Sequence, residues 1–233
     1  MTLFQQFDTA HLLSLLLITS ISIGCSVLGY RSKSAEAKGV FPWVLVLFLI
    51  TNEIYIHAAA IAAGQWRMSW ALPLHLCDLS FFAVMVALIW KNQVAWELAY
   101  YWGIGGSIPA LITPDIPLAF PHFYFVTFFI HHGGIIFGVL YLAFSEKYSL
   151  PFSSIKRVWL ITHVYVVFIA FFNLTMKTNY LFLCAKPTQP SLIDYLGPWP
   201  YYIIGLEMIF TSTLFLLYWL FHVVTKKMKG TGH

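Results

Sequence analysis

The residues of this chain that could do chemistry are a cysteine and two adjacent histidines inside apolar stretches. Cys77 lies between His75 and Asp78, and His131 is followed directly by His132. Thiol attack on an ester or thioester needs a thiolate, a nearby base to generate it, and hydrogen-bond donors for the oxyanion. Cys77 and an intramembrane histidine could supply the first two parts. The set therefore indicates thiol chemistry narrowly ahead of metal chemistry.

Further ionisable and polar residues lie inside apolar stretches, several of them four positions apart. Residues four apart share a helical face, and ionisable side chains in a bilayer usually face a bundle interior or a cavity. We therefore expect five helices to deliver polar groups to one layer at the depth of Cys77. The expected supporting or substrate-binding residues are Asp78, His75, Glu53, His57, Asn173, Lys177 and Glu207.

Each supporting residue has a role in thiol chemistry and a plainer structural role. For thiol chemistry, His75, Asp78 or Glu207 would orient the histidine base, while Asn173 or Lys177 would hold a substrate phosphate or the oxyanion. In the plainer interpretation, His75 and Asp78 form a pair that fixes helix packing. Lys177 and Asn173 would then extend toward the outer interface.

His131 rather than His132 is the expected base. Counting four, seven and eleven residues on from Thr127 gives His131, Gly134 and Gly138, a stripe of polar and small residues suited to face other helices. The stripe that contains His132 is largely apolar. His131 would therefore point inward, within reach of the thiol.

Two other classes of protein compete with a thiol enzyme. A non-enzymatic transporter or receptor would use the polar layer to bind a solute or carry protons. A haem or metal protein would use several intramembrane histidines as ligands. The seven-helix zinc hydrolases carry HxxxH in their last helix, whereas the last apolar stretch here has only His222. We expect no metal and no cofactor.

Composition places the positioning elements in a membrane. Of the 233 residues, 60% are apolar and 9% are charged, against about 25% charged in soluble proteins. The net charge is +4, but the sequence has no stripe of basic residues and no nucleic-acid-binding motif, so nucleic acid is not an expected partner. The three cysteines stand singly, which argues against disulfides and a structural zinc site.

Seven stretches are long and apolar enough to cross a bilayer, which takes about 20 residues each. The chain is therefore expected to be an all-α, polytopic membrane protein with one seven-helix domain over residues 1–233. The expected spans are His11–Tyr30, Val40–Gly64, Met68–Trp90, Val94–Thr113, Phe120–Phe144, Trp159–Leu183 and Trp199–Val224.

The basic residues of the links between spans set the orientation. The positive-inside rule predicts an external amino terminus and a cytoplasmic carboxyl terminus, because ten bases fall on one side, two on the other, and Lys177 within a span. We expect a multi-pass protein of the inner, or plasma, membrane. The inner bases are Arg31, Lys33, Lys38, Lys91, Lys147, Lys156, Arg157, Lys226, Lys227 and Lys229, and the outer ones are Arg67 and Lys186.

Four segments in order along the chain carry a resemblance to a known family. They are LPLHLCD at Leu72–Asp78, YWGIGGSIPALITPD at Tyr101–Asp115, FPHFYFVTFFIHHG at Phe120–Gly133, and NYLFL..KP with LGPWPYY within Asn179–Tyr202. In these segments the chain resembles the YwaF-type integral membrane proteins of bacteria, which are related to the vertebrate transmembrane protein 164 family.

The resemblance implies an acyl-transfer enzyme. The vertebrate relatives are membrane acyltransferases that move fatty acyl chains between phospholipids, including ether-linked lysophospholipids, with a cysteine and a histidine. More distant relatives, the androgen-induced lipid hydrolases, use threonine in place of cysteine. Carried over, the cysteine is Cys77 and the histidine is His131 or His132. The implied partners are membrane phospholipid or lysophospholipid substrates, and the implied activity is acyl transfer or hydrolysis.

Overall fold

A computed structural model describes residues 2–31, 40–145 and 148–230. Its regular elements are helices, together with one isolated bridge between Leu3 and Leu118, so the all-α prediction is confirmed. The α-helices are α1 Thr9–Arg31, α2 Phe41–Ala62, α3 Met68–Ala71, α4 Leu76–Trp90, α5 Gln93–Ile112, α6 Phe123–Ser145, α7 Ser153–Met176 and α8 Tyr201–Gly230, and the 3-10 helices are η1 Tyr180–Phe182 and η2 Leu192–Leu196.

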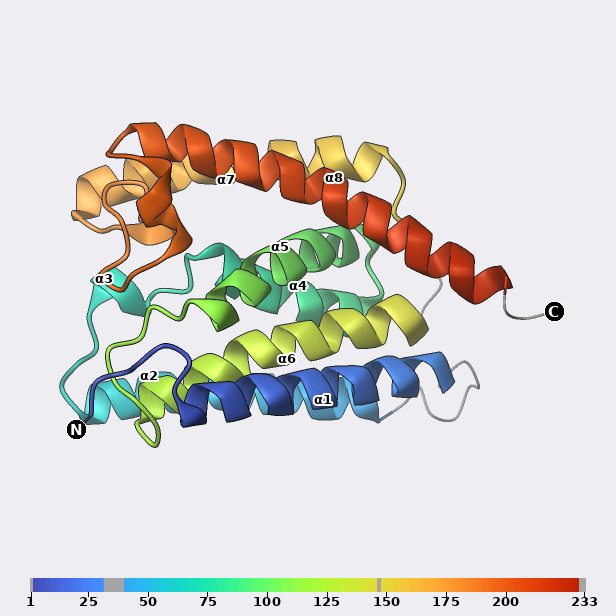
Figure 1. Ribbon diagram of the computed structural model, residues 1–233, viewed down its shortest axis with the longest axis horizontal. Coiled ribbons are helices and arrows are strands. Elements are labelled where there is room, and N and C mark those ends of the chain that lie inside the picture. The colour runs from blue at the N-terminus through green and yellow to red at the C-terminus, as the bar shows by residue number, and fades with distance from the viewer. Residues whose placement is uncertain (1, 32–39, 146–147, 231–233) are drawn as a thin grey trace.

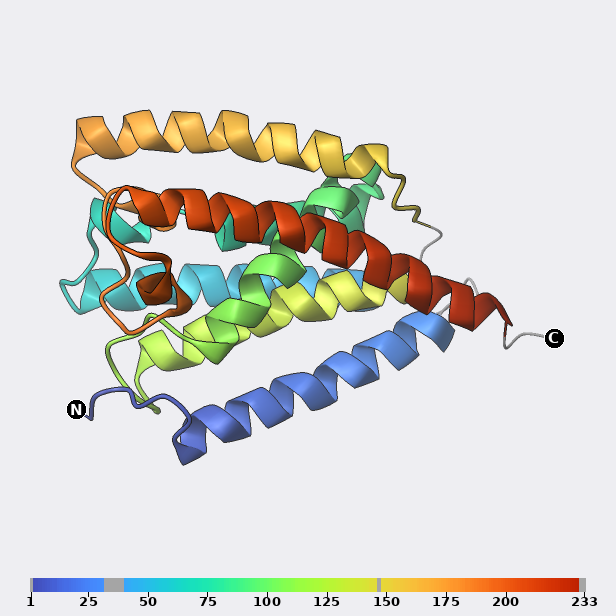
Figure 2. The same ribbon diagram turned by 45° about the horizontal axis from the view of Figure 1, so that its top comes forward.

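The long helices lie side by side, and the chain passes back and forth between two ends of the bundle (Figures 1 and 2). α6 contacts α1, α2, α4 and α5, while α7 and α8 contact α5 and each other. α2 finishes, and α4 and α6 begin, at the end that also holds the amino terminus (Figure 1). We call this the site end. The carboxyl terminus lies at the opposite end.

Five helices are long and apolar enough to span a membrane: α1, α2, α6, α7 and α8. α4, with 15 residues, is a shorter apolar helix, and α5 is not among the five. α5 contains Glu97 and three glycines, and much of its length is buried against its neighbours. A helix enclosed by protein need not be apolar on every face. Seven spans and the orientation of the termini therefore stay predictions.

The expected continuous helix over Met68–Trp90 is wrong. α3 ends at Ala71, residues 72–75 are not helical, and α4 begins at Leu76. Leu72 is extended (ψ 141°) before Pro73, as a residue before proline prefers. Cys77 therefore lies in the first turn of a new helix, and its expected depth, counted along one unbroken helix, no longer follows.

The expected ends of the last two helices also differ from the structure. α7 begins at Ser153 and ends at Met176, and Lys177 follows in the left-handed region at φ 55°. Lys177 therefore lies outside the helix, and it does not continue the helical face of Asn173. α8 begins after Pro200 and extends to Gly230, consistent with the preference of proline for helix amino termini.

Close helix packing at glycines is confirmed. A Cβ on Gly134 would overlap the side chain of Leu49 on α2, and a Cβ on Gly138 would overlap Val84 on α4. A Cβ on Gly103 would lie 2.9 Å from Ile135 on α6. Glycine here lets helices approach closely, and this brings α2, α4 and α5 against α6, the helix that carries the two histidines.

Candidate functional site

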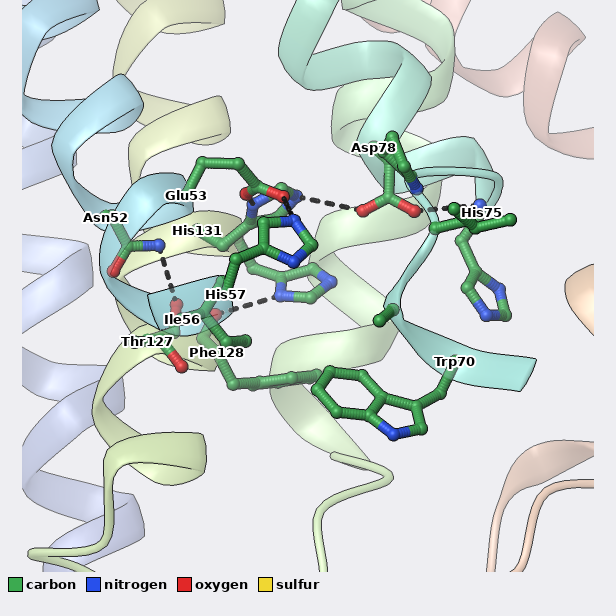
Figure 3. A pocket seen from close by; sticks show the side chains of 14 residues that line it. Asn52, Glu53, Ile56, His57, Trp70, His75, Asp78, Thr127, Phe128 and His131 are labelled. Carbon is green, nitrogen blue, oxygen red and sulfur yellow. Dashed lines mark hydrogen bonds and ion pairs between the residues drawn. The ribbon is translucent and has the colours of Figure 1, made fainter. Parts of the chain in front are cut away.

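A cavity of about 140 Å³ opens at the site end between α2, the α3–α4 break and α6. Figure 3 shows Glu53, His57, His131 and Asp78 pointing toward one another, while the ring of His75 points away from them. Glu53 and His57 come from α2, His75 and Asp78 from the start of α4, and both His131 and His132 from α6. Six of the ten residues expected to form the site are therefore brought to one place.

Four of these side chains, together with Trp66 from the loop after α2, form a continuous series of polar contacts. The indole Nε1 of Trp66 donates to His57 Nδ1 at 3.2 Å, and His57 Nε2 lies 3.3 Å from Glu53 Oε1. Glu53 Oε2 lies 3.4 Å from His131 Nδ1, and His131 Nε2 lies 3.7 Å from Asp78 Oδ1. His131 thus stands between two carboxylates from different helices.

Local structure fixes both carboxylates. Glu53 is one turn before His57 on the same face of α2, and the neighbouring Asn52 ties α2 to α6 by donating to the Thr127 carbonyl oxygen at 3.2 Å. Asp78 Oδ2 accepts the backbone N–H of His75 at 2.8 Å. A carboxylate that accepts an N–H at the start of a helix stabilises that terminus.

His131 is held by packing as well as by charge. Its ring stacks on Phe81 of α4, with centroids 5.3 Å apart and an interplanar angle of 16°. The His131 residue is 8% exposed, and its buried Nε2 has no hydrogen-bond partner. A buried polar atom in that condition is costly in a purely structural role, which makes this ring a candidate functional group.

His132 has a different environment. Its Nδ1 donates to the Phe128 carbonyl oxygen at 2.9 Å, and its ring lies 4.1 Å from the Phe128 ring, centroid to centroid. Residue His132 is also 8% exposed. The stripe expected to be largely apolar is therefore a packed interior face, and both histidines are enclosed by protein.

Cys77 is half-buried and is not among the residues that line the cavity. A Cβ placed on Gly106 of α5 would lie 3.3 Å from its Sγ atom. The residue after it, Asp78, faces the His131 ring at 3.7 Å. Cys77 shares a face of α4 with Phe81 and Val84, both of which contact α6. The thiol therefore lies where α4, α5 and α6 meet.

Asn173 acts within the α7–η1 connection rather than in the cavity. Its Oδ1 accepts the N–H of Tyr180 at 2.9 Å and the hydroxyl of Thr178 at 2.8 Å, and its Nδ2 donates to the Tyr180 carbonyl at 2.8 Å. Lys177 is exposed. Neither residue is brought near the histidines, so the structure gives no contact that supports a phosphate or oxyanion role for them.

The connection held by Asn173 supports the α3–α4 break instead. The Tyr180 hydroxyl accepts the N–H of Leu72 at 3.0 Å and donates to the carbonyl of Met68. The rings of Tyr180 and Phe182 pack against His75, with centroids 5.2 and 5.5 Å from it. Tyr180 could not be identified from sequence, because nothing in its spacing relates it to residue 72.

Glu207 belongs to a second cluster, between α7 and α8. Its carboxylate oxygens lie 2.9 Å from His163 Nε2, 3.0 Å from Trp159 Nε1 and 2.8 Å from Thr211 Oγ1. None of these groups lines the cavity, so Glu207 has no contact through which to orient the base. His163 was missed at the sequence level, although an ionisable residue within a spanning stretch was a signal.

Within the described ranges, no group of three or more His, Cys, Asp or Glu side chains is arranged to hold a metal ion. The groups at the cavity instead alternate imidazole and acid, in the order His57, Glu53, His131, Asp78. Such an arrangement can hold and move protons close to a thiol, with two partly exposed carboxylates fixing the orientation of the His131 ring.

Comparison with known proteins gives one match. No curated protein and no solved structure shows significant similarity to the chain. The model of the TMEM164 family matches residues 6–218, a region that includes every side chain of the cavity. The narrower likeness to YwaF-type proteins stays a prediction. The chain belongs to the TMEM164 family.

Proposed function

We propose that this protein is a membrane-embedded enzyme that moves an acyl chain of a glycerophospholipid through a thioester on Cys77. One observation carries the proposal: the half-buried Cys77 lies in the first turn of α4, directly before the Asp78 that faces His131, and a Cβ on Gly106 of α5 would lie 3.3 Å from its Sγ atom. A helix amino terminus and a nearby imidazole both favour a thiolate.

The reaction has two halves. A histidine of the pair takes the thiol proton of Cys77, and the thiolate attacks the ester carbonyl carbon of the lipid. The carbon–oxygen bond to glycerol then breaks, and the lysolipid oxygen leaves with the proton from the imidazolium. In the second half, the imidazole deprotonates a lysolipid hydroxyl or water, which attacks the thioester and releases the thiol.

The position of the cavity supports a lipid substrate. It lies at one end of a bundle with five potential spanning helices, among aromatic side chains such as Trp70 and Phe128. A lipid with its ester near the interface could present the carbonyl there while its chains stay among apolar helices. The proposal places the protein in the inner, or plasma, membrane as a multi-pass enzyme with phospholipid or lysophospholipid partners and without nucleic acid.

The test is lipid turnover by the purified protein in vesicles. Phospholipid labelled in one acyl chain is incubated with and without an unlabelled lysophospholipid acceptor, and the products are separated by mass. We expect labelled acceptor in the first case and labelled fatty acid in the second. Vesicles with a variant that lacks Cys77 should give neither product. Unchanged lipid with the unmodified protein, across several headgroups and chain lengths, would overturn the proposal.

A second candidate is a proton-coupled transporter, which the series from Trp66 to Asp78 favours. Titratable side chains at 3.3 to 3.7 Å from one another, shared among helices, are also an arrangement that carries protons. In that case replacement of Cys77 would leave function intact, while replacement of Glu53 would abolish pH-driven flux across the vesicle. The same vesicles with an internal pH dye separate the two candidates.

A further inference from the structure

We infer that the two histidines have different roles: His132 is the base that takes the thiol proton, and His131 is a cationic donor that stabilises the oxyanion. The inference rests on the proposed function and deepens it. It reverses the assignment that the sequence favoured, which took His131 as the base because of its polar stripe.

The first step concerns His131. Its Nδ1 faces Glu53 at 3.4 Å and its Nε2 faces Asp78 at 3.7 Å. At these distances the two carboxylates act on the ring as nearby negative charges rather than as hydrogen-bond acceptors, and opposite charges favour the doubly protonated, positively charged imidazole. A ring in that state has no lone pair with which to take a proton. Its Nε2, which lacks a hydrogen-bond partner within bonding distance, is instead available as a donor to a developing negative charge.

The second step concerns His132. A backbone carbonyl can only accept, so the 2.9 Å contact with Phe128 places the proton of a neutral ring on Nδ1. The remaining nitrogen, Nε2, then carries the lone pair. No acidic side chain is paired with His132 in the described part of the chain, whereas His131 has two such partners. This tautomer is the one a general base requires.

The third step concerns the depth of His132 in the bundle relative to the thiol. His132 shares a face of α6 with Ile135 and Val139, and a Cβ on Gly103 of α5 would lie 2.9 and 3.1 Å from these two side chains. Gly106, which the Cys77 thiol contacts, is about one turn nearer the site end than Gly103.

α5 and α6 run in opposite directions between the two ends (Figure 1). His132, about one turn before Ile135, is therefore level with Gly106. Cys77 comes to the same point from α4. His132 and the thiol thus lie at the level of the same turn of α5.

The ionisable surroundings of the pair are few. α2 contributes Glu53 and His57, and the start of α4 contributes His75, Asp78 and the thiol itself. The half of α5 from Gly103 to Ile112 contributes none, and α1 contributes His11, whose ring packs on Phe129. The base proposed here is therefore the one ring of the pair whose charge is not balanced by an acid.

The test measures how readily the Cys77 thiol reacts, without any lipid. The background is the double variant Cys25→Ala, Cys184→Ala, in which Cys77 is the one remaining cysteine. Its rate of alkylation by iodoacetamide is followed by intact mass across pH, alone and with His132→Ala, His131→Ala or the matched control His163→Ala. Melting temperatures identify any variant that has not folded, and for such a variant the asparagine replacement is used.

His132→Ala is expected to slow alkylation at neutral pH by about tenfold or more and to move the rate profile upward in pH toward that of a free thiol. His131→Ala removes a positive charge near the thiol and is expected to move the profile upward by less than His132→Ala does, while His163→Ala should match the background. A profile moved by His131→Ala but not by His132→Ala would overturn the inference, as would an equal shift in both. Because no lipid is involved, the assignment of His132 as the base of the thiol can stand even if the lipid turnover assay fails, whereas the oxyanion role of His131 falls with it.

Discussion

Two clusters in this bundle each pair a histidine with an acid, yet only one has the features of a site. In the cluster of α2, α4 and α6, His131 keeps a buried Nε2 without a hydrogen-bond partner, beside a cavity and a thiol. In the cluster of α7 and α8, the Glu207 carboxylate is satisfied by His163, Trp159 and Thr211, and none of these residues lines the cavity between α2, α4 and α6.

The difference shows what separates function from structure within a spanning bundle. An ionisable pair is costly in a bilayer in either case, and a closed network removes that cost by satisfying every atom. A network in which one buried atom has no hydrogen-bond partner, next to space for a ligand, keeps part of that cost. We therefore expect the first cluster to govern activity and the second to govern how α7 is held to α8.

The largest expected effect is that of Cys77→Ala. A covalent step cannot occur without its nucleophile, so lipid turnover should fall to background, whereas the melting temperature should change little because the side chain is small and half-buried. Cys25→Ala and Cys184→Ala serve as controls, one at a buried and one at an exposed cysteine. Turnover retained in Cys77→Ala would favour the transporter instead.

The next effect compares the two acids directly. Glu53→Gln leaves His131 with one carboxylate and should lower turnover about 100-fold, a typical loss for one electrostatic partner of the transition state. Glu207→Gln should keep turnover within about twofold and lower the melting temperature by about 2–4 °C, since it weakens hydrogen bonds between α7 and α8. If Glu207→Gln lowered turnover more than Glu53→Gln, the cluster of α7 and α8 rather than that of α2, α4 and α6 would govern activity.

A smaller effect is expected from Gly106→Ala. The new methyl group would lie 3.3 Å from Cys77 Sγ and would displace the thiol by a few tenths of an ångström. Misplacement of a nucleophile on this scale should slow turnover about tenfold. Gly105→Ala is the matched control, because its methyl group would meet Thr213 of α8 at 3.2 Å instead. Equal rates in the two variants would argue against a reaction at Cys77.

The smallest effect is that of Tyr180→Phe. It removes the hydroxyl that joins Leu72 and Met68 at the α3–α4 break, which should cost about 1 kcal/mol of stability and reduce turnover a few-fold. Tyr100→Phe, which removes a hydroxyl bonded to the Leu217 carbonyl at 3.0 Å, should cost similar stability and leave turnover unchanged. Chemical denaturation and the vesicle assay measure the two quantities.

Sequence alone predicted the helical class and the main cluster. Helical periodicity placed Glu53 and His57 on one face of α2. The occurrence of ionisable residues within apolar stretches identified His131, His132 and Asp78, which the structure brings to the same cavity. These predictions succeeded because they depend on local spacing and on the cost of charge in a bilayer. Both are visible in one segment at a time.

The rest depends on contacts between distant segments. The helix expected over Met68–Trp90 is interrupted because Pro73 and the Asp78 cap favour a new start, and Tyr180 holds that break from more than a hundred residues away. Asn173 and Glu207 have the residue types of a site, but their partners come from the loop after α7 and from α7 itself. Spacing within one helix carries no information about those partners.

The most direct test of the account is the mass of Cys77 after the protein meets a phospholipid labelled in one acyl chain. The protein is quenched in acid after a short incubation without acceptor, digested, and analysed for the peptide that contains residues 72–90. We predict that this peptide gains the mass of the labelled acyl group as a thioester, which hydroxylamine removes and which Glu53→Gln reduces. Lipid turnover by the unmodified protein with no adduct on Cys77 at any time point would contradict the account.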